Sequence, residues 1–218
     1  MGSFLVIGMG RFGSSLAVEL HQLKHDVLVL DKREEDVAGV ISQVTDAVIG
    51  DAKDEGVLRS LGIQNFDSVI VCMADAIEDS ILTTMTLKEL GAKHIICKAQ
   101  NERHAKILSQ LGAEKVIRPE YDMGKRVANT LARRNIRDYL EISSDYGVME
   151  IITPGQWANK SIMKNNLRRK YGVTVMAFRD RETGKVEFSP DADAILREGD
   201  TLTVIGSKKC LDAVGALK

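Results

Sequence analysis

The feature of this sequence that most constrains its fold is a glycine motif near its start, Gly8–Gly13 (GMGRFG). The motif directly follows an apolar run, Phe4–Ile7, and opens an amphipathic segment, Arg11–Leu23. An acidic residue, Asp31, closes the next apolar run. A strand, a glycine turn and a helix, followed by a strand that ends in an acid, are typical of a dinucleotide-binding βαβ unit. The sequence therefore predicts an α/β protein with a Rossmann-like, doubly wound parallel sheet.

Each glycine of this motif has its own physical role. Gly8 makes the tight turn, Gly10 lets the backbone approach a pyrophosphate, and Gly13 lets helix and strand pack closely. The phosphates then meet free backbone N–H groups at the positive end of the helix. Asp31 would accept hydrogen bonds from ribose hydroxyls and repel a 2′-phosphate. The alternative is a glycine turn that binds no ligand.

Repeated βα units extend through the first 120 residues, because short apolar runs alternate there with amphipathic segments. The predicted strands are Phe4–Ile7, Asp26–Leu30, Ala47–Ile49, Ser68–Met73, His94–Lys98 and Lys115–Ile117. The predicted helices are Arg11–Leu23, Glu34–Gln43, Asp54–Leu61, Ile77–Leu90 and Glu102–Leu111. Gly62, Gly91 and Gly112 each follow a predicted helix, where a left-handed C-cap is expected.

The pattern changes in the last third of the chain. Short strand-like runs separated by turns indicate a second, smaller α+β domain from Asp138 to Lys218. Its predicted strands are Val148–Ile152, Val173–Phe178, Val186–Phe188 and Thr201–Ile205.

Between the two domains, Met123, Val127 and Leu131 recur at helical spacing after Pro119. We expect a helix there that links the domains or packs on a partner subunit. The predicted division is a nucleotide-binding domain at 1–120, a crossover or dimerisation helix at 121–137 and a C-terminal domain at 138–218.

Composition and charge exclude several classes of protein. The formal net charge of −1 argues against a nucleic-acid-binding protein, which normally has a clear cationic excess. No apolar run approaches the ~18 residues of a membrane-spanning helix, so we expect a cytoplasmic protein. Cys72, Cys97 and Cys210 lie far apart and are expected to be core residues rather than disulfides or metal ligands.

Three residues near the predicted ligand-binding edge have two interpretations each. Arg11 would bind a terminal phosphate, or it would only be solvated. Asp51 would contact an adenine amino group, or it would cap the short helix near Asp54. Lys98 would face the ligand, or it would only solvate the end of its strand. The residues alone leave these alternatives open.

The main alternative function is an NAD-dependent oxidoreductase with a small substrate domain. Such an enzyme needs a proton donor or acceptor near the nicotinamide, and the four histidines show neither pairing with a nucleophile nor metal-ligand spacing. Tyr121 and Lys125 form the Y-x-x-x-K pair of short-chain dehydrogenases. Because those enzymes space their glycines differently, we interpret this match as chance and predict no catalytic residues.

Several motifs together resemble the RCK domain (regulator of K⁺ conductance), and more narrowly the cytosolic regulatory subunits of Trk/Ktr-type potassium uptake systems. They are VIGMGRFG with Arg11 inside it, the acid Asp31, GDA with Asp51, KAQN from Lys98 and RPEYDMG from Arg118. The second domain resembles the C-terminal lobe of the same proteins through its NLRRKYG and REGD segments. The resemblance spans nearly the whole chain.

This resemblance implies a regulatory subunit and no enzyme. Its Rossmann-like lobe would bind ATP or ADP, and in some relatives NAD(H), and the bound nucleotide would control K⁺ flux. Homodimers would assemble into a homo-octameric ring under a membrane potassium-translocating subunit, at the inner face of the cell membrane. Glu120 matches a carboxylate that reaches Mg²⁺ or Ca²⁺ bound with the nucleotide. In a subset of relatives the second lobe binds cyclic di-AMP, at positions that Arg168 and Pro190 match.

The candidate nucleotide-binding residues lie in these motifs or directly beside them. Glu120 is also the candidate metal ligand. They are Gly8, Gly10, Arg11, Phe12, Gly13, Asp31, Lys32, Asp51, Ala52, Lys98 and Glu120.

Overall fold

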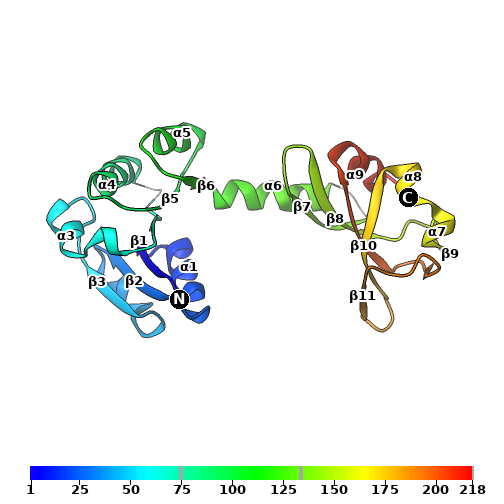
Figure 1. Cartoon of the computed structure of the whole chain (residues 1–218), viewed down its shortest axis with the longest axis horizontal. Helices are drawn as coiled ribbons and strands as arrows, with labels where there is room; N and C mark the ends of the chain where they lie inside the picture. Colours follow the sequence, from blue (N-terminus) through cyan, green and yellow to red (C-terminus); the bar gives the residue numbers. More distant parts are fainter. Residues whose placement is uncertain (74–75, 133–134, 218) are drawn as a thin grey trace. The chain divides into compact units, whose positions relative to one another are not determined.

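The chain forms two compact units, which a computed structural model describes over residues 1–73, 76–132 and 135–217. The first unit, the N-lobe, is Met1–Pro119, and the second, the C-lobe, is Glu120–Lys218 (Figure 1). The helix that follows Pro119 groups with the C-lobe.

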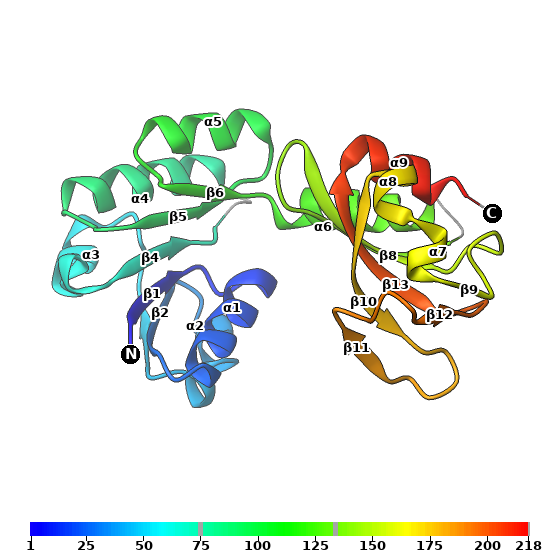
Figure 2. The ribbon, with the colours of Figure 1, turned by 45° about the vertical axis from the view of Figure 1, so that its right-hand side comes forward.

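The N-lobe is a six-stranded parallel sheet with helices on both faces (Figure 2). Its strands are β1 (Ser3–Ile7), β2 (Asp26–Asp31), β3 (Asp46–Ile49), β4 (Ser68–Val71), β5 (Ile95–Lys98) and β6 (Lys115–Ile117). Its helices are α1 (Arg11–Gln22), α2 (Glu34–Ala38), α3 (Glu55–Ser60), α4 (Ile77–Glu89) and α5 (Glu102–Gln110), with 3₁₀ turns η1 (Ile41–Gln43) and η2 (Ile63–Asn65). The strands lie in the order β3-β2-β1-β4-β5-β6 and are all parallel. From β1 the chain first adds strands on one side of the sheet and then, from β4, on the other side, which confirms the predicted doubly wound sheet.

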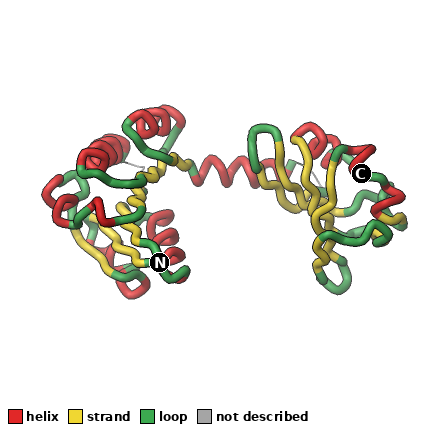
Figure 3. Tube along the Cα trace, viewed as in Figure 1, coloured by secondary structure: helices red, strands yellow, loops and turns green. Residues whose placement is uncertain are grey.

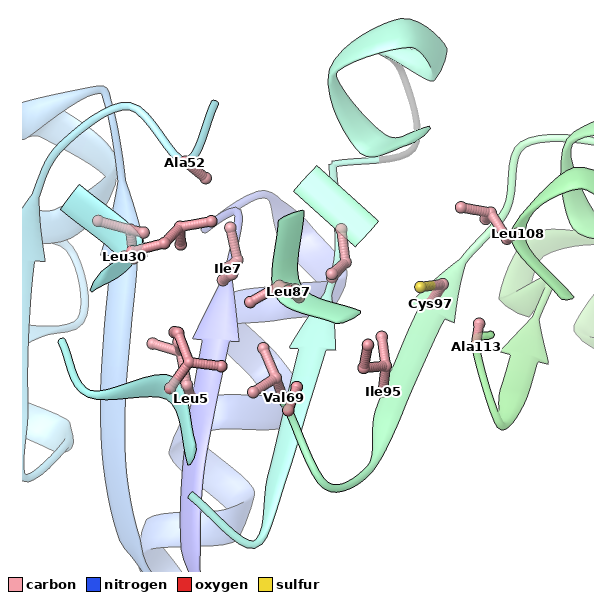
Figure 4. Packing of buried hydrophobic residues seen from close by; sticks show 14 of the residues in the cluster. Leu5, Ile7, Leu30, Ala52, Val69, Leu87, Ile95, Cys97, Leu108 and Ala113 are labelled. Atoms are coloured by element: carbon pink, nitrogen blue, oxygen red, sulfur yellow. The ribbon is translucent and has the colours of Figure 1, made fainter. Parts of the chain in front are cut away.

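Both faces of this sheet are packed. Leu5 and Val6, neighbours on β1, point to opposite faces, and both are fully buried. On the Leu5 side the core includes Leu58 of α3, Leu87 of α4 and Leu108 of α5. Figure 4 shows Leu5, Leu87 and Leu108 in this cluster. On the Val6 side the core is closed by α1 and by the segment around η1. Burial on both faces explains why the strands are apolar nearly throughout.

The predicted helix Glu34–Gln43 is interrupted in the structure. It forms α2 and then η1, with Gly39 at the C-cap of α2. Glycine is a poor helix former, and at Val40 the backbone leaves helical geometry (φ −126°) so that the side chain is buried against the sheet. The glycine caps are confirmed: Gly62, Gly91 and Gly112 all have positive φ.

The C-lobe is built on a five-stranded antiparallel sheet of order β11-β10-β13-β8-β7 (Figure 3). These strands are β7 (Ile136–Glu141), β8 (Tyr146–Ile152), β10 (Val173–Arg179), β11 (Val186–Phe188) and β13 (Thr201–Ser207). A second pair joins β9 (Lys160–Ser161) to β12 (Ile195–Leu196). The helices are α6 (Pro119–Leu131), α7 (Ile162–Asn165), α8 (Leu167–Tyr171) and α9 (Lys208–Gly215). The smaller α+β lobe is thus as predicted.

A single buried cluster holds the C-lobe together. Trp157 is 1% exposed and packs edge to face on Tyr171, with ring centroids 5.3 Å apart. Met149 of β8 and Leu202 of β13 lie in the same cluster.

The sequence did not predict β7. Ile136 and Tyr139 are its buried residues, and a register shift between Ile136 and Asp138 breaks the alternation that marks a strand. α6 ends at Leu131, so the predicted segment 121–137 contains the helix and the start of β7, while its residues 133 and 134 lie outside the described part of the chain.

Among the described residues, no helix has the length and apolar character needed to span a membrane. Cys72 and Cys97 are buried, as predicted, whereas Cys210 is only partly buried. Burial raises the pKa of the Cys72 thiol to about 12 and that of Cys97 to about 11, so both stay protonated at neutral pH.

Candidate functional site

A cavity of about 350 Å³ opens where β1, β2, β3 and β4 end. This is the place where open α/β sheets bind ligands, and the volume is within the range of small-molecule sites. The predicted residues that line it are Gly8, Gly10, Asp31, Lys32, Asp51 and Ala52.

The glycine turn has the geometry that the motif predicts. Gly8 has φ +94° and donates its N–H to Leu30 O at 2.8 Å. A Cβ on Gly13 would lie 1.9 Å from Gly8 O, so only glycine fits there. A Cβ on Gly10 would meet nothing within 4 Å. Gly10 is also the N-cap of α1, with no side-chain cap and no acid in the first turn. The turn therefore leaves space and an unneutralised helix N-terminus for an anion.

Asp31 lies at the end of β2 with its carboxylate held by the backbone. Oδ2 accepts a hydrogen bond from Met9 N–H at 2.6 Å, and Oδ1 accepts one from Arg33 N–H at 2.9 Å. Each carboxylate oxygen can accept a second hydrogen bond. Asp31 is therefore positioned on the cavity wall with capacity left for hydroxyl donors.

The structure excludes the capping interpretation of Asp51. Asp54 is the N-cap of α3, because its Oδ1 accepts a hydrogen bond from Gly56 N–H at 2.7 Å. Asp51 is not that cap; it lines the cavity and accepts a hydrogen bond from Lys53 N–H at 3.0 Å. The neighbouring Ala52 is buried.

Three further candidates are Arg11 and Phe12 of α1 and Lys98 of β5. Arg11 is exposed on the first turn of α1. The Nζ of Lys98, at the end of β5, lies 5.9 Å from the centroid of the Phe12 ring, within cation–π range. Lys98 therefore lies against the helix of the glycine motif.

Sequence reasoning missed part of the cavity wall. Cys72 and Met73 follow β4, and Ala76 and Asp79 come at the start of α4. These residues could have been predicted from their position just after β4. β4 lies next to β1 where the strand order reverses, and the carboxyl ends of these two strands border the same crevice.

The remaining candidates lie in the C-lobe. Glu120 is exposed in the first turn of α6. In the described part of the chain, no three His, Cys, Asp or Glu residues gather as a metal site. Arg168 is exposed on α8, and Pro190 is partly buried between β11 and β12.

The geometry also bears on the Y-x-x-x-K match. Lys125 Nζ donates a hydrogen bond to Glu141 Oε2 at 2.7 Å, and this bond raises the pKa of Lys125. Lys125 of α6 is therefore paired with an acid at the end of β7.

The fold and the cavity together define a two-domain protein whose N-lobe has a Rossmann-like fold with a cavity at the place where such folds bind nucleotides. Two family models match the chain, the TrkA-N domain over residues 4–119 and the TrkA-C domain over residues 148–218. The chain is 43% identical over 206 residues to the Ktr system potassium uptake protein A of Bacillus subtilis, which covers 94% of this chain and 92% of that protein. It is 41% identical over 204 residues to the Ktr system potassium uptake protein C of the same organism, covering 94% of this chain and 91% of the relative. The chain belongs to this family of Ktr/TrkA potassium uptake proteins.

Solved structures support the fold. The GsuK channel bound to NAD matches 99% of this chain with a TM-score of 0.70 at 21% identity, and the match covers 39% of the channel chain. The crystal structure of the GsuK RCK domain matches with a TM-score of 0.68 at 22% identity, over 99% of this chain and 47% of that one. The predicted RCK resemblance is confirmed.

Proposed function

We propose that this chain is a nucleotide-binding regulatory subunit of a potassium uptake system, in which the bound nucleotide controls K⁺ flux through a membrane partner. Its relatives named above are potassium uptake proteins. The observation that carries the proposal is the cavity at the carboxyl ends of β1 and β4. There Gly10 leaves open space beside the N-terminus of α1, which has no side-chain cap.

In this proposal the cavity binds ATP or ADP, with NAD(H) as a further ligand. The turn of Gly8, Gly10 and Gly13 holds phosphate, Asp31 and Lys32 hold the ribose, and Asp51 and Ala52 border the adenine. A bound nucleotide fits the residues present, because the open helix end favours phosphate and the Asp31 carboxylate can accept hydroxyl hydrogen bonds. Relatives of this fold have been solved bound to NAD and to ADP.

A ligand shifts a conformational equilibrium only through interactions that differ between the two states. For ATP against ADP, we assign that difference to Arg11 at the terminal phosphate and to a Mg²⁺ or Ca²⁺ ion shared with Glu120 of a neighbouring subunit. Lys98 would add a positive charge near this site, because its Nζ lies over the ring of Phe12 in the first turn of α1.

An exposed apolar stripe on α6 supports the assembly part of the proposal. Met123, Val127 and Leu131 repeat at helical spacing, and Leu131 is 80% exposed. Apolar residues gathered on a surface mark an interaction site. We assign this stripe to a homodimer contact, with dimers forming an octameric ring at the cytoplasmic face of a membrane potassium-translocating subunit.

A second ligand completes the proposal. Arg168 lies among the exposed cations Lys164, Arg169 and Lys170, on and beside α8. This cluster and Pro190 would take the dianion cyclic di-AMP, since a dianion is stabilised by several nearby cations.

The experiment that tests the function is a calorimetric titration with ATP, ADP and NADH, combined with an assay for turnover. We expect binding without consumption of ligand. NADH oxidation that follows an added small substrate would instead support the oxidoreductase alternative, because a dehydrogenase must consume its cofactor.

Two variants locate the difference between nucleotides. Arg11→Ala should weaken ATP more than NAD⁺, by about 1.5 to 3 kcal/mol for a charge-assisted contact, while the control Arg59→Ala on α3 should change neither. Glu120→Gln should abolish any rise in melting temperature that Mg²⁺ adds to the ATP-bound protein. Equal loss of both ligands in Arg11→Ala, or an unchanged Mg²⁺ increment in Glu120→Gln, would contradict these assignments.

A further inference from the structure

Five charged residues gather at one side of the cavity, and only one of them, Asp31, belongs to the dinucleotide-binding motif. We call them the ribose-edge cluster: Asp31, Lys32, Asp51, Lys53 and Asp79. They come from the ends of β2 and β3 and from the first turn of α4. Three loops that are distant in sequence thus bring their charges to the same edge of the sheet.

Asp79 lies between the two lysines of this cluster. Its Oδ1 is 3.4 Å from Lys53 Nζ, and its Oδ2 is 4.0 Å from Lys32 Nζ. Lys53 Nζ is also 3.9 Å from Asp51 Oδ2. The side chain of Asp79 is only 22% exposed, against 59% for Lys32. Asp79 is therefore the shielded centre of the arrangement.

The balance of charge decides what this edge attracts. Three carboxylates face two ammonium groups in the ribose-edge cluster, so its net charge is negative. Among the described residues that line the cavity, the other cation is Arg33, which is paired with Asp36. A phosphate on the ribose would have to displace carboxylates from these cations, and a phosphate site needs cations that are available to it.

A simpler role for Asp79 is to stabilise α4, since acids in the first turn of a helix interact favourably with its dipole. The structure gives no side-chain hydrogen bond at this helix N-cap, which is Ala76. Glu78 lies in the same first turn and is exposed. It therefore carries the same helix-dipole effect and provides a matched control.

We propose that Asp79 is a positioning residue that determines ligand specificity. It holds Lys32 and Lys53 so that the cavity accepts adenine nucleotides with a free 2′-hydroxyl and rejects those with a 2′-phosphate. The inference rests on the proposed function, because it concerns the ribose of a nucleotide bound in this cavity.

The test measures dissociation constants of the whole chain for ADP and for 2′-phospho-ADP, which differ only by the 2′-phosphate. The wild type should prefer ADP by about tenfold or more. Asp79→Asn should reduce that preference, measured as the ratio of the two dissociation constants, by about tenfold or more, because two cations become available to the 2′-phosphate. Adding Lys32→Met to this variant should restore part of the preference, and Glu78→Gln should leave it unchanged.

Several outcomes overturn the proposal. It fails if Asp79→Asn binds ADP normally and keeps the wild-type preference, or if Glu78→Gln reduces the preference equally. If Asp79→Asn does not fold, Asp79→Ser tests the same arrangement: it should also reduce the preference for ADP, and an unchanged preference refutes the proposal. A wild type that binds neither nucleotide refutes the proposed function itself, which separates that failure from the others.

Discussion

The N-lobe and the C-lobe place their surface chemistry in different ways. In the N-lobe, parallel strands end together at one edge, and helices cover both faces, so polar side chains collect in one cavity at that edge. In the C-lobe, antiparallel neighbours end at opposite edges, and the exposed candidates Arg168 and Leu131 lie on helices. A candidate ligand site can therefore be located from topology in the N-lobe, whereas the topology of the C-lobe does not bring its candidate residues to one edge of its sheet.

The two lobes also differ in charge. Acidic residues outnumber basic ones in the N-lobe, and the reverse holds in the C-lobe. The net charge of −1 therefore conceals two regions of opposite sign.

The largest effect should come from Gly13→Ala, which tests whether the lobes fold separately. The new Cβ would stand 1.9 Å from Gly8 O, and overpacking against backbone should destabilise the N-lobe by about 3 kcal/mol or more. Trp157 is the single tryptophan and lies in the C-lobe core, so its fluorescence reports on that lobe alone. We expect the circular dichroism melt to shift while the fluorescence melt stays in place.

Gly10→Ala is the matched control, because its Cβ would meet nothing within 4 Å. Its stability should fall by no more than about 1 kcal/mol, since alanine is only a poorer N-cap than glycine. A fluorescence melt that falls together with the circular dichroism melt in Gly13→Ala would mean that the two lobes unfold as one unit.

The converse change is Met149→Ala in the C-lobe core. Met149 is fully buried, and truncation of such a side chain costs about 2 to 5 kcal/mol. The fluorescence melt should fall, and nucleotide affinity in the N-lobe should not change. Met163→Ala, at a side chain that is 60% exposed, is the control and should have little effect. Weakened nucleotide binding in Met149→Ala would contradict the independence of the lobes.

A smaller effect should come from pH changes in the range where histidine titrates, and we expect it in the N-lobe because all four histidines lie there. His104 is buried on α5, and its Nδ1 accepts a hydrogen bond from Gln100 N–H at 3.3 Å. Burial lowers the pKa of His104 below 6.5, so the unfolded state binds the proton more tightly. N-lobe stability should therefore fall as pH decreases below 6.5.

The measurement is the pH dependence of both melts from about pH 7.5 to about pH 5.5. His104→Gln should flatten the N-lobe dependence, and His94→Gln, at an exposed histidine, should not. An N-lobe dependence that is equally steep in wild type and His104→Gln would assign it to other groups.

The smallest effect should come from Glu141→Gln in the C-lobe. Hydrogen bonds from Lys125 and Lys208 lower the pKa of Glu141 to about 2, and they tie α6 and α9 to the end of β7. Exposed ion pairs contribute little, so the fluorescence melt should fall only slightly at neutral pH. Because the pKa of this acid is lowered, its contribution is complete above 4.5 and is lost as pH falls through about 2.

The difference between wild type and Glu141→Gln should thus persist below pH 4.5 and shrink toward pH 2. Glu182→Gln, at an exposed acid in a turn, is the control and should leave the melt unchanged at every pH. If the wild type and Glu141→Gln already melt alike near pH 4.5, the pKa of Glu141 is not lowered.

The N-lobe could be predicted further than the C-lobe because its signals are local. The strand, the glycine turn and the acid Asp31 are close in sequence, and each residue type has a defined backbone role. Asp79 escaped prediction because its meaning depends on Lys32 and Lys53, which approach it only when three loops meet. β7 escaped because a register shift hides its alternation. The ligand assignments of Arg11, Glu120 and Arg168 stay predictions.

The start of α6 has a consequence for the freedom of the chain between the lobes. The N-lobe ends at Pro119, which is also the first residue of that helix. The proline ring fixes its own φ and restricts Arg118 to extended backbone, and the lost N–H costs the helix nothing at this position. Arg118 and Pro119 therefore have fewer backbone conformations to lose when the start of α6 forms, because the unfolded chain already has less conformational entropy at these two residues.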